Sequence, residues 1–155
     1  MIGLALSPEQ FKTLLRMVYI ANTVVNGHRD EDFATEYDDL EQYVFSRAKD
    51  AGFPAATSRH QLAGEDHHHP SEAFDNDPEV NALLDQYDIH IMLELLSEKL
   101  AENEIEAKFG PGASEKMPAH DYEKLLEEYA EVYSKEFLIN GFKNVAVKRD
   151  EEKTV

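Results

Sequence analysis

The residues best suited to chemistry form a short run, Glu65, Asp66, His67, His68 and His69. Neutral imidazole and carboxylate together suit divalent transition metals such as Zn, Ni, Cu or Fe. However, three successive side chains in a loop need a particular turn before all of them face one ion, and the spacing matches no established zinc pattern. The run therefore predicts either a metal site built from these five residues or a polar loop that binds metal only opportunistically.

A second candidate is the pair His90 and Glu94, four residues apart within the apolar stretch 89–96. Read as a helix, this stretch has apolar residues on nearly every side, so we expect neighbouring helices to enclose it. The pair is a weak catalytic candidate, as a base with its orienting carboxylate, or else as two metal ligands. The simpler alternatives are a core histidine satisfied by a hydrogen bond and a glutamate at a solvent edge. No glycine-rich phosphate loop and no Gly-x-Ser-x-Gly elbow is present.

The charge of the chain is strongly and unevenly acidic. There are 32 Asp and Glu residues against 15 Lys and Arg residues, and the net charge is −17. Residues 78–141 hold 15 of the acidic residues and only 5 of the basic ones. Such a surface repels phosphate backbones, which argues against nucleic acid and anionic membranes as partners. A basic protein or a cation is the attractive alternative, unless the charge serves solubility alone.

Length and composition set the class of protein. A chain of 155 residues fits one ordinary domain, and 42% hydrophobic residues are enough for a core. The absence of cysteine excludes disulfides, thiolate metal sites and cysteine nucleophiles. The first six residues are too short an apolar run for a signal peptide, and no stretch approaches the length of a membrane span. We therefore expect a cytoplasmic protein.

The elements that must position these residues are mostly helices. Apolar periodicity and capping signals predict an all-α domain over residues 1–148, with four principal helices near 8–26, 33–51, 78–109 and 118–140 and a charged tail at 149–155. The helix at 8–26 has Ser7 as its cap, Pro8 at the first position and Gln10 completing a capping box. Residues 53–77 lack a sustained period and are expected to form a long His-rich loop. The ends, near 2–6 and 142–148, are predicted to pair as a small two-stranded sheet.

Two functional hypotheses follow. The first is a non-catalytic acidic interaction module, an adaptor or inhibitor that meets a basic partner through the face formed by residues 78–141. Exposed aromatics such as Tyr43 or Phe45 beside that acidic face would favour it. The second is a metal-binding protein or metal-dependent enzyme that uses the loop 65–69 or His90 with carboxylates. The broad apolar faces predicted for 8–26 and 78–109 are also compatible with a homodimer.

Overall fold

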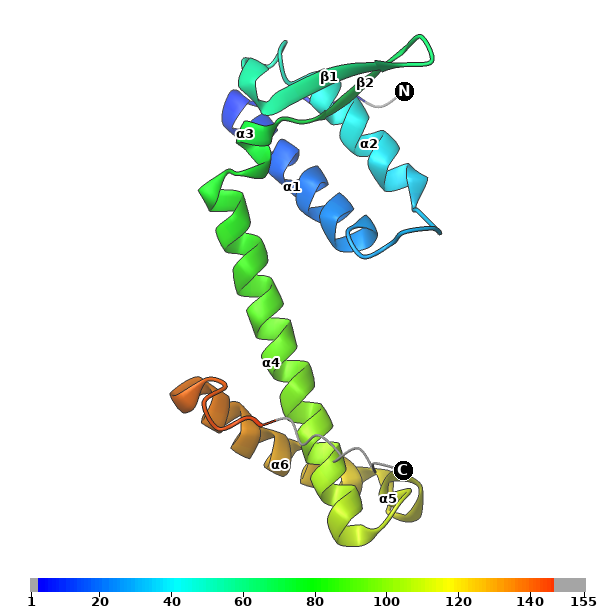
Figure 1. Ribbon diagram of the computed structural model, residues 1–155, viewed down its shortest axis with the longest axis vertical. Coiled ribbons are helices and arrows are strands. Elements are labelled where there is room, and N and C mark those ends of the chain that lie inside the picture. The colour runs from blue at the N-terminus through cyan, green and yellow to red at the C-terminus, as the bar shows by residue number, and fades with distance from the viewer. Residues whose placement is uncertain (1–2, 147–155) are drawn as a thin grey trace, which may run out of the picture. The chain divides into compact units, whose positions relative to one another are not determined.

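The computed structural model describes residues 3–146 and is mostly helical, as the sequence predicts. In this part of the chain, six α-helices accompany one two-stranded antiparallel sheet (Figure 1). The chain divides into two compact units, Met1–Gln86 and Tyr87–Val155, and the predicted bundle of four helices is not confirmed. The prediction of one domain over residues 1–148 stays a prediction.

The first unit is built on the helical pair α1 (Pro8–Asn26) and α2 (Thr35–Ser46). The start of α1 confirms the predicted capping box. The Ser7 side chain accepts a hydrogen bond from the Gln10 backbone N–H, and the Gln10 side chain accepts one from the Ser7 backbone N–H. The α2 helix is shorter than the predicted 33–51. Residues 47–52 form turns instead, Gly52 has a φ of +94°, and the Phe53 amide donates to the Ala48 carbonyl at 2.8 Å. That hydrogen bond closes the turn segment that follows α2, in the pattern of a Schellman motif.

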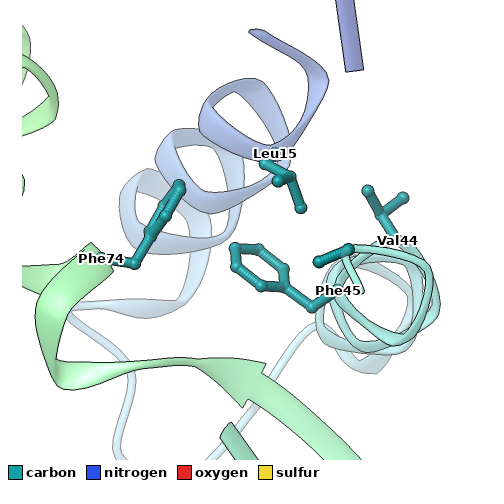
Figure 2. Close-up of a cluster of buried hydrophobic side chains, with 5 residues drawn as sticks. Leu15, Val44, Phe45 and Phe74 are labelled. Carbon is teal, nitrogen blue, oxygen red and sulfur yellow. The ribbon is translucent and has the colours of Figure 1, made fainter. Parts of the chain in front are cut away.

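The core of this unit converges on Phe45, which is fully buried. Figure 2 shows its ring between Leu15 of α1 and Phe74 of α3 (Glu72–Asp75). The Phe45 and Phe74 rings pack edge to face with their centroids 5.1 Å apart, a favourable arrangement for aromatic pairs. Val44 and Ala48 complete the buried cluster. The helix pair is therefore held by side chains from both helices and from the segment that follows the sheet.

The segment predicted as a long loop contains the sheet. After the short 3₁₀ helix η1 (Pro54–Ala56), β1 (Thr57–Leu62) pairs with β2 (Glu65–Pro70) in a hairpin. Ala63 and Gly64 form its two-residue turn, with φ values of 53° and 89°. Positive φ at both positions matches the turn geometry that suits the twist of hairpin strands.

The prediction of a sheet between the chain ends is wrong for the residues that the structure describes. Residues 3–7 and 142–146 contain no strand, while residues 2, 147 and 148 of the predicted pair lie outside the described range. A lone strand needs a partner, and here each strand of the hairpin finds its partner across a two-residue turn. The expectation of a small two-stranded sheet is thus confirmed, but its location is not.

The long helix α4 (Pro78–Phe109) has the predicted bounds and contributes to both units. In the first unit, Val80 is buried, and Arg16 of α1 forms ion pairs with Asp77 at 3.2 Å and with Glu79. Gly110 and Gly112, with φ values of 90° and 71°, end the helix and lead into α5 (Ala113–Lys116). The predicted stop at residues 110–112 is confirmed.

In the second unit, side chains of α4 form hydrogen bonds with α6 (Ala119–Asn140), and α5 packs against α6. Tyr133 donates to Glu104 at 2.8 Å, and the Lys108 ammonium donates to the Tyr129 hydroxyl at 2.8 Å. Lys108 also lies 2.8 Å from Glu104, so these groups form one network between α4 and α6. The buried residues of this unit are few and come from all three helices: Ser97, Ala101, Ile105, Ala113 and Phe137.

Candidate functional site

The histidine run lies on β2, where the side chains alternate between the two faces of the hairpin. His67 and His69 share one face, and the pairing of His60 with His67 brings His60 to the same face. His68 lies on the other face, opposite Arg59. The hairpin therefore divides the predicted ligand set and places His60, upstream of it in the sequence, beside His67.

The three histidines of one face are close neighbours. The ring centroids of His67 and His69 are 6.3 Å apart, as are those of His60 and His69. His67 Nδ1 is 3.0 Å from the side-chain oxygen of Gln42 on α2. Within residues 3–146, no group of three or more histidine or acidic side chains is arranged to hold a metal ion. The metal site with Glu65 stays a prediction without geometric support.

The opposite face of the hairpin is organised by an ion pair. Arg59 contacts both carboxylate oxygens of Asp66 at 2.6 Å, and this hydrogen bonding holds the pKa of Asp66 below its ordinary value. Gln61 also donates to Asp66 at 3.3 Å. Asp66 is thus engaged in cross-strand pairing with Arg59, on the face opposite His67 and His69.

Within the second unit, the expected enclosure of residues 89–96 is not found. Ile89, Met92 and Leu95 are about half exposed, and the side chains of His90 and Glu94 are 75% and 66% exposed. His90 Nε2 lies 3.8 Å from Glu94 Oε2, so the pair is real but solvated. In the second unit the helices α5 and α6 cover only part of α4, which leaves an apolar sequence partly uncovered.

A groove between α4 and α6 has a volume of about 750 Å³. Its apolar floor is formed by Leu93 of α4 and by Leu126, Ala130 and Leu138 of α6. Leu138, at one end, is 85% exposed. The volume lies within the range of ligand-binding clefts, and an exposed apolar surface of this kind is typical of interaction sites.

Carboxylates line both sides of this floor. The residues are Glu94 and Glu98 on α4 and Glu123, Glu127 and Glu131 on α6. In each helix they are four residues apart, so they follow one another turn by turn along the same face. Glu131 pairs with Lys135 at 2.7 Å, which lowers its pKa. In the part of the chain that the structure describes, the other four have no Lys or Arg within ion-pair distance. The groove thus carries an unbalanced negative charge.

Ser97 is a polar residue in the lining of the groove. Its residue is only 3% exposed, yet its hydroxyl oxygen has no hydrogen-bond partner among the described residues. Buried polar groups are nearly always paired, because an unpaired one costs about 1–3 kcal/mol. Ser134 lines the same groove from α6. The Ser97 oxygen itself is inaccessible to solvent, so it lies beneath the surface of the groove.

A buried carboxyl in the first unit escaped the sequence analysis. Glu41 is 4% exposed and accepts a hydrogen bond from Asn22 at 3.0 Å. Burial raises the pKa of Glu41 to about 7, the Asn22 hydrogen bond opposes that rise, and the negative charges of Asp38 and Asp75 add to it. Glu41 precedes the core residues Val44, Phe45 and Ala48 by three, four and seven positions. This helical spacing was the available signal that its side chain faces the core.

The two aromatic residues proposed as exposed markers behave differently. Tyr43 is 59% exposed, with the Arg47 guanidinium 5.1 Å from its ring centroid, whereas Phe45 is the centre of the core. Phe33, Tyr37 and Leu40 are also substantially exposed near or on α2. These apolar groups belong to the first unit, and the groove of the second unit is a separate feature.

Comparison of the chain with protein-family models, with curated proteins and with solved structures finds no match. In the described part of the chain, no helix combines the length and apolar character required to cross a membrane. The functional argument therefore rests on the geometry of the groove.

Proposed function

We propose that this chain is a non-catalytic acidic interaction module, an adaptor or inhibitor, that binds a basic partner protein in the groove between α4 and α6. The observation that carries the proposal is the apolar floor between two rows of carboxylates, four of which have no Lys or Arg partner in residues 3–146. The floor supplies area to bury, and the carboxylates supply the charge that selects a partner.

The charge distribution supports the same assignment. The groove lies within residues 78–141, the segment with the largest acidic excess. Complementary charge accelerates association and disfavours partners of like charge, so a basic protein is attracted and an acidic one is repelled. Most of the acidic residues involved are exposed, so this attraction weakens as salt screens it.

Two variants test the proposal. The groove variant carries Glu94→Gln, Glu98→Gln, Glu123→Gln and Glu127→Gln. The control variant carries Glu31→Gln, Glu36→Gln, Glu65→Gln and Glu72→Gln, which are exposed and lie in the first unit. Each variant raises the net charge by the same amount, so a difference between them reports the location of the charge.

The experiment compares the proteins that the wild-type chain, the groove variant and the control variant each retain from an extract of the source cells. We expect a basic protein that the wild type and the control variant retain and the groove variant loses, and we expect the purified pair to dissociate as salt increases. Equal retention by both variants, or a captured partner without a basic surface, would contradict the proposed function.

A further inference from the structure

We infer that the occupant of the groove is an amphipathic helix of the partner protein, with an apolar stripe on the floor and Lys or Arg residues along both of its edges. This inference rests on the proposed function and specifies the chemistry of the partner. It follows from the length of the groove, from the few hydrogen-bonding groups on its floor and from the two-sided arrangement of its charges.

The groove is long enough to bind an α-helix. Its walls are themselves helices, and the acidic row from Glu123 to Glu131 extends over eight residues, about 12 Å at the helical rise of about 1.5 Å per residue. A third helix laid between two packed helices buries its apolar side chains in the depression between them. At about 5.4 Å per turn, about two turns of a partner helix span this row, and about two more reach Leu138 at the end of the floor.

The floor has few groups that could form hydrogen bonds with the backbone of an extended peptide. Apart from the carboxylates and His90, its polar side chains are Ser97 and Ser134, and the groove has no sheet edge in its lining. An extended segment would bury backbone N–H and C=O groups without partners, which is costly. A helix satisfies its own backbone and presents only side chains, so it fits this surface better than an extended strand does.

The charges define the edges of the occupant. Glu94 and Glu98 lie on one wall, and Glu123 and Glu127 lie on the other. A cation on only one edge of the helix would leave one wall unpaired, so we expect basic residues on both sides of the apolar stripe.

A second copy of this chain fits the groove poorly. Its net charge is −17, and apposing the groove of one copy with that of another would bring the same carboxylates together. Like charges at an interface suppress association. The charge complementarity therefore favours a basic segment from a different protein.

The probe is a synthetic helix of about 16 residues with Leu at positions one, five, eight and twelve and Lys on both edges of that stripe. The comparison peptide has the same composition in an order that gives no apolar face. Affinity is measured calorimetrically for the full wild-type chain, the groove variant and the control variant. Circular dichroism reports whether the peptide becomes helical when bound and whether each variant remains folded.

We expect the helical peptide to bind the wild type and the control variant with similar affinity. Binding to the groove variant should be about 30-fold weaker, because the variant loses four ion pairs with the peptide. This factor takes for each pair a free energy near the middle of the range measured for exposed ion pairs. The same-composition peptide should bind at least about tenfold more weakly, since it cannot place Leu on the floor, and tenfold is the loss of about 1.4 kcal/mol.

Failure of this inference can be separated from failure of the proposed function. If both peptides bind equally and the groove variant weakens both, the groove attracts cations without selecting a helix, and only the inference fails. If the groove and control variants bind every peptide equally, the groove is not the site, and both proposals fail. If the wild type is a dimer and the groove variant changes its dimerisation, a second copy occupies the groove and the inference is overturned.

Discussion

The buried carboxyl of Glu41 makes the stability of the first unit dependent on pH. Its pKa is raised to about 7 in the folded chain, against an ordinary value of 4.5, mainly because burial disfavours the charged form. In the unfolded chain the same group ionises at the ordinary value. Between these two values the folded state binds the proton more tightly, so stability falls as pH rises.

The size of the effect follows from the shift. A difference of about 2.5 pKa units corresponds to about 3 kcal/mol of stability, which is present at low pH and lost as pH rises through about 7. From pH 5.5 to pH 8 the expected loss is about 2 kcal/mol, because part of it has already occurred below that range. The lower pH stays above the isoelectric point of about 4.6, where the chain would be least soluble.

The test is Glu41→Gln, which keeps the shape of the side chain and the oxygen that accepts from Asn22 but cannot ionise. Relative to wild type, we expect the variant to gain about 2 kcal/mol of stability between pH 5.5 and pH 8. Amide hydrogen exchange in α1 and α2 measures this in the unit that contains Glu41. Exchange in α6, which belongs to the other unit, serves as an internal reference.

The exposed variant Glu31→Gln removes one charge without removing a buried carboxyl, so it controls for the change in net charge. Its stability relative to wild type should be the same at both pH values. A constant difference between Glu41→Gln and wild type at pH 5.5 and pH 8 would refute the reasoning, because the carboxyl would then ionise alike in the folded and unfolded chains.

Two further substitutions test how the first unit is held together. Phe45→Ala should destabilise it by about 3–5 kcal/mol, because the substitution leaves a cavity among Leu15, Val44 and Phe74. Faster amide hydrogen exchange in α1 and α2 would report this loss. A loss below about 1 kcal/mol would mean that Phe45 is not the centre of the core. Asn26→Ala should cost about 1–3 kcal/mol, because the Asn26 side chain donates to the Ala34 carbonyl at 3.1 Å and accepts from the Ala34 amide at 2.9 Å. Exchange of the Ala34 amide measures this directly, and unchanged protection there would show that Asn26 does not hold the connection.

The helices were the predictable part of the fold, because their signals are local. The capping box at Ser7 and the glycines after Phe109 define the start of α1 and the end of α4 without reference to other parts of the chain. Apolar spacing correctly located α6 to within one residue of its predicted start. Periodicity and caps are determined within a few neighbouring residues, so one sequence is sufficient to reveal them.

The hairpin escaped prediction because it lacks the usual strand signals. Its strands carry polar side chains on both faces, so no alternation of apolar and polar residues marks them. The turn has Ala63 at a position with positive φ, where Asn, Asp or Gly would be the recognisable residue. The hairpin places His60 beside His67, a neighbourhood that depends on register and cannot be seen in the order of residues alone.

The sequence predicted the negative charge of the groove but not the groove itself. The acidic excess of residues 78–141 is a property of composition, and it led to the hypothesis of a basic partner. Which side chains gather around Leu93 and Leu126 depends on the faces that α4 and α6 turn toward each other, and this is set by packing. The same packing explains why residues 89–96, apolar on nearly every side, are only partly covered.

The most direct test of the account is to locate the bound basic helix on the chain by methyl NMR. Titration of the Leu and Lys peptide into chain labelled at Leu and Ala methyl groups should shift the signals of Leu93, Leu126 and Ala130, which form the floor. The exposed methyl groups of Leu40 and Leu62, which lie in the first unit, should not move. Shifts confined to Leu40 and Leu62, or spread evenly over the acidic surface, would contradict the assignment of the groove as the binding site.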